Sequence, residues 1–111
     1  MTTQPDNSEW RTAVAAFAAQ ARAALGPRLA RLILYGSRAR GDARADSDID
    51  LLAVVTGDGD DARRTLWRLA VELELATPAI FFTVVVMTAA EWEEQRDFSF
   101  NKAVRKEGVA V

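Results

Sequence analysis

The chain has 111 residues, half of them hydrophobic, which is enough for one domain with a modest core and too few for a second full domain. Sixteen acidic against fourteen basic residues give a net charge of −2, so no overall positive field favours general binding to nucleic acid or to an anionic membrane. The absence of cysteine and histidine excludes disulfides, zinc fingers, thiol nucleophiles and Ser-His-Asp triads, which leaves carboxylate and hydroxyl chemistry.

The chain shows no segment suited to a bilayer. Its N-terminus is polar and acidic, and its longest apolar run, residues 79–86, is interrupted by Thr83 and is far too short to span a membrane. We therefore expect a cytoplasmic protein without membrane attachment, folded as one domain over residues 1–111 with a flexible lead at residues 1–7.

The first third of the chain predicts a helix followed by a strand. Ser8 is a suitable N-cap, and Gly26-Pro27 is a suitable stop. Between them, apolar residues recur at spacings of three and four, as on one face of a helix. They are Trp10, Val14, Phe17, Ala21 and Leu25. The apolar run 29–35 that follows predicts a buried strand.

A polar segment separates this strand from the next one. Residues 36–48 are too polar for a strand and are rich in turn formers, so they predict a loop. Residues 49–55, rich in branched apolar side chains, predict a second buried strand. Loops of this kind on a packed scaffold often carry function.

A second long helix is predicted after a turn at residues 57–59. Asp60 is placed to cap it, and its apolar stripe ends before Thr77-Pro78. That stripe consists of Leu66, Leu69, Ala70 and Leu73.

The last third predicts one more strand and two short helices. Residues 80–87 predict the strand, and Thr88 with Glu91 fits a capping box at the start of a helix. Residues 101–107 predict a final helix, ended by Gly108. This order predicts an α/β or α+β domain with a small mixed sheet and helices mainly on one face.

The polar loop begins with residues suited to phosphate. Gly36-Ser37 directly follows a strand, so the chain can turn sharply there and offer backbone N–H groups and the Ser37 hydroxyl to an anion. Arg38, Arg40 and Arg44 add local positive charge within an acidic protein.

The loop ends in two closely spaced carboxylates. Because side chains alternate along a strand, Asp48 and Asp50 fall on one face while Ile49 enters the other. Two such carboxylates repel each other unless a cation lies between them, and oxygen ligands suit Mg²⁺ or Mn²⁺. Together with the phosphate loop, they indicate metal-nucleotide chemistry.

Residues 36–52, GSRARGDARADSDIDLL, closely resemble the signature of the DNA polymerase β-like nucleotidyltransferase superfamily, and above all its minimal branch. The resemblance implies that fold, with Gly36 and Ser37 binding a nucleoside triphosphate, expected to be ATP, and Arg38 and Arg40 as further phosphate contacts. It implies that Asp48 and Asp50 are the catalytic and metal-binding residues, holding Mg²⁺ or Mn²⁺ while an acceptor hydroxyl attacks the α-phosphate and pyrophosphate is released.

One departure from the family pattern concerns the strand at 80–87. Active members usually carry a third carboxylate there, whereas here Thr83 is the only polar residue, and a hydroxyl is neither an anionic base nor a strong metal ligand. Glu91 follows the strand, but the capping box explains it.

Two functions therefore stay open. The first is an enzyme that transfers a nucleoside monophosphate to an acceptor hydroxyl, which can belong to a partner protein. The second is a nucleotidyltransferase-like antitoxin that neutralises a partner, since the resemblance implies pairing of such small proteins with a helical HEPN-domain toxin. In either case the chain is too short to hold the acceptor alone.

Other motif interpretations fail on single residues. A Walker A loop from Gly36 to Gly41 needs Lys-Ser or Lys-Thr where Asp42-Ala43 stands. An EF-hand starting at Asp46 needs glycine where Leu51 stands and glutamate where Gly57 stands. The aromatic residues at helical spacings are expected to be mostly core rather than base-stacking platforms. They are Trp10, Phe17, Trp67, Trp92, Phe98 and Phe100.

The strand at 80–87 is apolar on both of its alternating faces, which predicts cover on both. The predicted helices suffice for one face only, so the other would be bare. We therefore expect a homodimer or a complex with a helical HEPN-domain partner, buried partly through Phe81, Val85 and Met87.

Overall fold

The computed structural model describes residues 9–111, so the predicted N-cap Ser8 and the lead at 1–7 lie outside the described residues. Within residues 9–111, no helix combines the length and the apolarity that crossing a bilayer requires.

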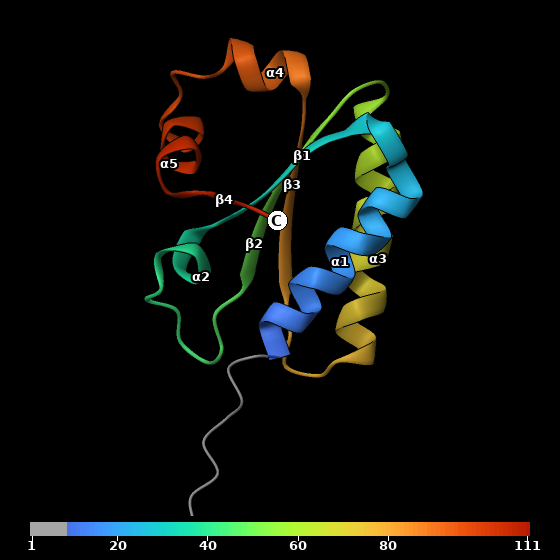
Figure 1. Cartoon of the computed structure of the whole chain (residues 1–111), viewed down its shortest axis with the longest axis vertical. Helices are drawn as coiled ribbons and strands as arrows, with labels where there is room; N and C mark the ends of the chain where they lie inside the picture. The colour runs from blue at the N-terminus through green and yellow to red at the C-terminus, as the bar shows by residue number, and fades with distance from the viewer. Residues whose placement is uncertain (1–8) are drawn as a thin grey trace, which may run out of the picture.

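Two long helices lie side by side on one face of the sheet (Figure 1). They are α1 (Glu9–Leu25) and α3 (Gly59–Ala76), and both follow the predicted apolar stripes. The cap of α3 is Asp58, whose carboxylate accepts hydrogen bonds from the backbone N–H groups of Asp60 and Asp61 at 3.0 and 3.3 Å. The predicted cap at Asp60 is therefore wrong by two residues, because Asp58 directly precedes the helix and its carboxylate reaches both N–H groups.

The sheet has four strands in the order β3-β2-β1-β4. Strand β1 pairs antiparallel with both β2 and β4, whereas β2 and β3 are parallel and joined by α3, so the sheet is mixed as predicted. The two-residue β4 was not predicted, because two residues carry no alternation to recognise. The strands are β1 (Leu29–Tyr35), β2 (Ile49–Val55), β3 (Phe82–Thr88) and β4 (Val109–Ala110).

Strand β2 is the centre of the molecule and carries both cores. Its side chains alternate between a larger apolar cluster under α1 and α3 and a smaller cluster on the opposite face. Ile49 and Leu51 belong to the larger cluster, while Leu52 and Val54 belong to the smaller one. Every side chain from Leu51 to Val55 is buried, as expected for a strand covered on both faces.

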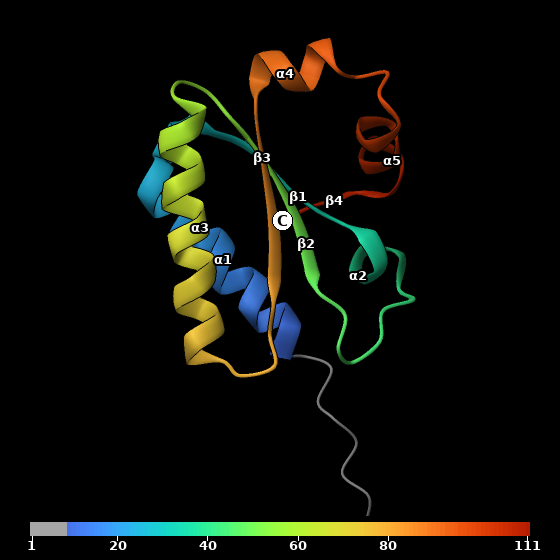
Figure 2. The ribbon, with the colours of Figure 1, turned by 180° about the vertical axis from the view of Figure 1, so that it is seen from behind.

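The opposite face is not bare, which corrects the expectation from sequence. Helices α4 (Ala89–Glu94) and α5 (Ser99–Glu107) lie on that side (Figure 2) and insert Trp92 and Val104 into the smaller cluster. Val85 and Met87 pack against this cluster and are half-buried, whereas Phe81 is 55% exposed. Two short helices thus provide the cover that the sequence analysis did not assign to this face.

The aromatic side chains divide between core and surface. Phe17 and Trp92 are buried as expected, and Trp10 is half-buried. The expectation was wrong for Trp67, Phe98 and Phe100, which are 68%, 62% and 38% exposed. Helical spacing identifies a face of a helix, but it does not say whether another element covers that face.

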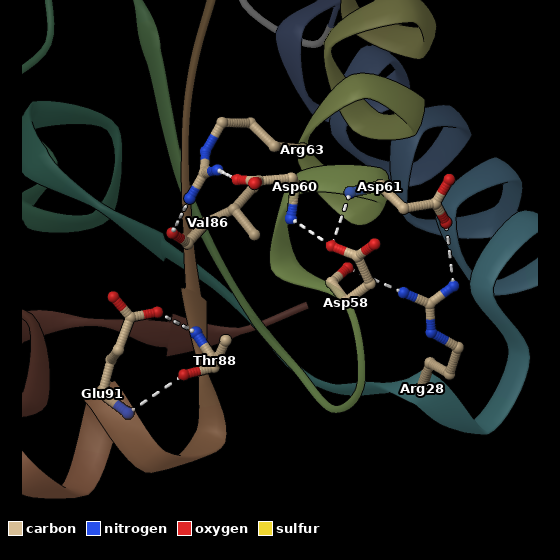
Figure 3. Close-up of polar contacts among 8 residues, drawn as sticks. All are labelled: Arg28, Asp58, Asp60, Asp61, Arg63, Val86, Thr88 and Glu91. Carbon is tan, nitrogen blue, oxygen red and sulfur yellow. Dashed lines mark hydrogen bonds and ion pairs between the residues drawn. The ribbon is translucent and has the colours of Figure 1, made fainter.

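The outer edge of β3 is partly covered by side chains of α3. Glu74 Oε1 accepts a hydrogen bond from the backbone N–H of Phe82 at 3.0 Å, and Arg63 Nη2 donates to the carbonyl oxygen of Val86 at 3.3 Å (Figure 3). Charged residues at such an edge hinder pairing with a strand of another chain.

Candidate functional site

The two predicted carboxylates lie at the start of β2, on the face of the smaller cluster. Ile49 is buried in the larger cluster beneath α1 and α3, so Asp50 projects on the side of Leu52 and Val54, as the alternation predicts. Asp48 is exposed and Asp50 is half-buried. Strand geometry therefore presents both carboxylates at one end of the sheet.

The glycine of the predicted phosphate loop lies directly against one of these carboxylates. Gly36 has φ +73°, and a Cβ atom there would lie 3.1 Å from Asp50 Cγ and closer still to Oδ2. Only glycine tolerates both the left-handed backbone and this approach. Because Tyr35 pairs with Asp50 across β1 and β2, the turn after β1 begins beside the carboxylates.

The predicted loop begins with a turn of helix. Helix α2 (Gly36–Arg40) ends at Gly41, which has φ +87° and donates its N–H to the carbonyl oxygen of Ser37 at 2.9 Å. Five residues are too few for a helical pattern in the sequence, so only a loop with a sharp turn at Gly36-Ser37 was predicted. Ser37 lies in the first turn of α2 and directly follows Gly36, the residue that approaches Asp50.

Thr83 faces the two aspartates from the neighbouring strand. It pairs in register with Asp50, and its Oγ1 donates a hydrogen bond to Asp48 Oδ2 at 3.3 Å. Thr83 therefore stands where a carboxylate on β3 would complete an acidic group. Within residues 9–111, no group of three or more Asp, Glu, His or Cys side chains is placed to hold a metal ion.

Glu91 does not reach this site. Thr88 pairs with Val55 at the opposite end of β2 and β3, and Glu91 lies in the first turn of α4 beyond it. Thr88 N donates to Glu91 Oε1 at 2.9 Å, and Glu91 N donates to Thr88 Oγ1 at 3.1 Å (Figure 3). The predicted capping box is confirmed.

The electrostatics of the aspartate end favour a cation. Burial raises the pKa of Asp50, the charge of Asp48 raises it further, and Arg40 opposes both effects. Burial and the charge of Asp50 together raise the pKa of Tyr35 to about 12. Hard oxygen donors with negative charge in excess fit a divalent ion such as Mg²⁺ or Mn²⁺, and Asp48 and Asp50 are the residues that would hold it.

The two arginines of α2 point in different directions. Arg40 pairs with Asp42 at 3.3 Å and with Glu107 of α5 at 3.1 Å, on the side of the aspartates. Arg38 donates to the carbonyl oxygens of Ser47 at 3.1 Å and Ala45 at 3.4 Å, so it holds the loop that carries Asp48.

Some of these contacts had no signal in the sequence. The guanidinium carbon of Arg38 lies 5.2 Å from the centre of the Trp10 ring on α1, and Arg40 reaches Glu107, 67 residues away. Such distant pairs form only once the fold is assembled. A phosphate contact by either arginine stays a prediction.

Comparison with known proteins identifies the class. The family model of the nucleotidyltransferase domain matches residues 18–106, so the chain belongs to this family. The match includes the loop with Gly36 and Ser37 and the strand with Asp48 and Asp50. No curated protein matches the chain.

Solved structures share the fold. A toxin-antitoxin with AMP-PNP is 24% identical, with a TM-score of 0.55 over 85% of this chain and 68% of that one. The toxin-antitoxin MntA-HpeT mutant is 23% identical, with a TM-score of 0.55 over 84% and 68%. A proposed nucleotidyltransferase from Sulfolobus solfataricus is 20% identical, with a TM-score of 0.51 over 98% and 90%. The expected polymerase β-like nucleotidyltransferase fold is confirmed.

Proposed function

We propose that this chain binds ATP together with Mg²⁺ or Mn²⁺ and transfers AMP to an acceptor hydroxyl. The observation that carries the proposal is the contact between Gly36 and the Asp50 carboxylate, because it brings a turn suited to phosphate and a pair of metal-binding carboxylates to one place. A nucleotide bound at this end of the sheet would have its phosphates beside both the turn and the carboxylates.

Each residue of the site then has a distinct task. Asp48 and Asp50 hold the divalent ion, which when bound would offset the negative charge of the phosphates. The Ser37 hydroxyl and the N–H groups at the start of α2 orient the triphosphate for in-line attack. Thr83, through its hydrogen bond to Asp48, is a positioning residue.

The reaction balances without a covalent enzyme intermediate. The acceptor oxygen bonds to the α-phosphorus, the bond from that phosphorus to the bridging oxygen breaks, and pyrophosphate leaves. The proton of the acceptor hydroxyl passes to solvent or to a base on the acceptor's own protein, because β3 carries a hydroxyl where a carboxylate would stand. This incomplete acidic group predicts slow transfer.

The hydroxyl of Thr83, in place of a carboxylate on β3, also favours a second function. A chain that holds nucleotide without an efficient base suits a binding module, and two of the similar structures are described as toxin-antitoxin assemblies. In that role the chain binds and neutralises a helical HEPN-domain toxin. The alternative association is a homodimer of two copies of this chain. Phe81, 55% exposed beside the site, is one apolar contact for either partner.

One assay separates the two functions. ATP labelled on its α-phosphate is incubated with the chain and Mg²⁺, with and without the co-purified product of the neighbouring gene. Label on that product supports the transferase, and a tight complex without label supports the module. If that product carries no label and forms no complex with the chain, both functions are contradicted.

A further inference from the structure

An apolar groove runs along α1, away from the aspartates. One wall is formed by side chains of α1, and the other by β1, β4 and the last residue, Val111. The groove has a volume of about 800 Å³. Leu34, Val109 and Val111 line it opposite α1, and Val109 is 49% exposed. A contiguous apolar groove at the surface is a candidate binding site.

The shape of the groove fits a helix better than a small molecule. Its α1 wall includes Trp10, Val14, Ala18 and Arg22, which recur every four residues over three turns. At about 1.5 Å per residue, this stripe is roughly 18 Å long. Ala15 and Ala19 lie on the same wall, and such small side chains let the backbone of another helix approach closely. Amphipathic helices bind in grooves of this kind.

The charge of the groove defines the chemistry of that helix. Arg11, Arg22 and Arg38 line it, and no carboxylate side chain does. Among residues 9–111, none of these three arginines forms an ion pair with an acidic side chain. Arg22 donates to the carbonyl oxygen of Val111, and Arg38 Nε is buried without a hydrogen-bond partner. The groove is therefore positive within a chain of net charge −2.

We propose that this groove binds an amphipathic helix of a partner protein, with the apolar stripe of that helix in the groove and its acidic residues against the arginines. A second copy of α1 is a poor occupant, because its own exposed face carries Arg11 and Arg22 and like charges repel. The inference concerns a surface apart from Asp48 and Asp50, and it holds whether or not the chain transfers AMP.

Arg38 connects the groove to the loop of the aspartates. Its side chain lines the groove beside Trp10, and its Nη2 bonds the carbonyl oxygen of Ser47, the residue before Asp48. A helix bound at this end of the groove contacts a residue that fixes the position of Asp48. Partner binding is therefore expected to alter the affinity of the aspartate site for ATP and Mg²⁺. By linkage, binding of ATP and Mg²⁺ is expected to alter the affinity of the groove for the partner by the same factor.

The test uses designed helical peptides as probes. One 18-residue peptide carries leucines at helical spacing flanked by glutamates, a twin has lysines in place of the glutamates, and a scrambled version keeps the composition. Titration of the full chain, followed by fluorescence anisotropy of labelled peptide, is expected to show binding of the glutamate peptide alone. That binding weakens as salt rises, since screening reduces the attraction.

Variants of α1 locate the site. Ala15→Glu with Ala19→Glu places bulk and negative charge in the groove, whereas Ala23→Glu with Ala24→Glu makes the same charge change at exposed positions of α1 outside it. The first pair is expected to weaken binding at least about tenfold, or ~1.4 kcal/mol, and the second to leave it within about twofold.

Several outcomes overturn the proposal. They are equal binding of the lysine or scrambled peptide, full binding to the Ala15→Glu, Ala19→Glu variant, equal loss in both double variants, and no binding of the glutamate peptide. Sedimentation velocity provides a further check. A dimer of the free chain that Ala15→Glu with Ala19→Glu disperses would assign the groove to a second copy instead.

Discussion

The two ends of the parallel pair β2–β3 are built in opposite ways. At the end with Thr88, the polar groups satisfy one another: the capping box joins Thr88 and Glu91, and these hydrogen bonds lower the pKa of Glu91. At the end with Asp50, burial and the neighbouring charge of Asp48 raise the pKa of the carboxyl. One end is complete without a ligand, whereas the other holds excess negative charge.

The comparison shows how one pair of strands serves stability and function separately. A closed capping box stabilises the start of α4 and needs nothing further. Carboxylates held close together cost folding free energy, and such an arrangement is typical of a site that binds a cation. Removal of a polar side chain should therefore change mainly stability at the Thr88 end and mainly ligand binding at the Asp50 end.

The largest effect is expected at Gly36. Gly36→Ala forces a side chain into the left-handed region and against the Asp50 carboxylate, so it should lower the free energy of unfolding by about 2–4 kcal/mol and abolish ATP binding. Urea unfolding measures the first effect and calorimetry the second. Gly41→Ala is the matched control, since Gly41 has φ +87° but open space around it, and should cost only about 1–2 kcal/mol. Equal losses in both variants would show that Asp50 does not crowd Gly36.

A threonine at each end gives a matched pair. Thr88→Ala removes the cap of α4 and should lower the free energy of unfolding by about 1 kcal/mol without changing ATP affinity. Thr83→Ala removes an exposed hydroxyl bonded to Asp48, so it should change stability by less than about 0.5 kcal/mol and weaken metal-dependent binding instead. Urea unfolding and calorimetry on both variants decide this. The reverse pattern would contradict the division between the two ends.

Thr83→Asp should increase the difference between the two ends, because it adds a third carboxylate at the end that holds Asp48 and Asp50. The added carboxylate faces Asp48 and Asp50, so without metal it should lower the free energy of unfolding by roughly 1 kcal/mol. Mn²⁺ should then raise Tm more than it does for the native chain, and AMP transfer should increase. Thr83→Asn keeps the size without the charge and should show neither gain. An Mn²⁺ response equal to that of the native chain would count against the placement of Thr83.

The smallest effect is the pH dependence of the two carboxylates. The raised pKa of Asp50 contributes stability below its unfolded pKa, and this is lost as pH rises through the folded pKa. The lowered pKa of Glu91 contributes stability above its unfolded pKa, which is lost as pH falls through the folded pKa. Carboxyl ¹³C NMR titration should show these opposite shifts, and Asp48→Asn should lower the pKa of Asp50. An unchanged value for Asp50 in Asp48→Asn would show that the two carboxylates do not interact.

Much of the fold could be predicted because the spacing of apolar residues along a long segment indicates both the type of element and the face that is buried. The stripes of α1 and α3, the apolar runs of β1 and β2 and the capping box at Thr88 each lie within a few neighbouring residues. The third strand was predicted two residues early, because Ile80 and Phe81 are apolar but precede the ladder with β2. The positions of Asp48 and Asp50 on one face followed from strand alternation alone.

What could not be predicted depends on contacts between distant residues. Helix α2 and strand β4 are too short for any pattern, and their formation depends on the elements beside them. The cover that α4 and α5 provide rests on Trp92 and Val104, which the sequence does not place on one face of a sheet. The link from Trp10 through Arg38 to Ser47 likewise joins residues far apart in the chain.

The central claim is that Asp48 and Asp50 bind a divalent ion for a nucleotide held at Gly36, and calorimetric titration with ATP and Mg²⁺ tests it most directly. The native chain should bind ATP in a Mg²⁺-dependent manner, and Asp48→Asn with Asp50→Asn should weaken binding at least about tenfold while keeping the fold. The charge-matched control, Glu94→Gln with Asp97→Asn, alters exposed carboxylates beyond the Thr88 end of β3 and should bind like the native chain. Equal affinity in the Asp48, Asp50 variant and the native chain would contradict the account.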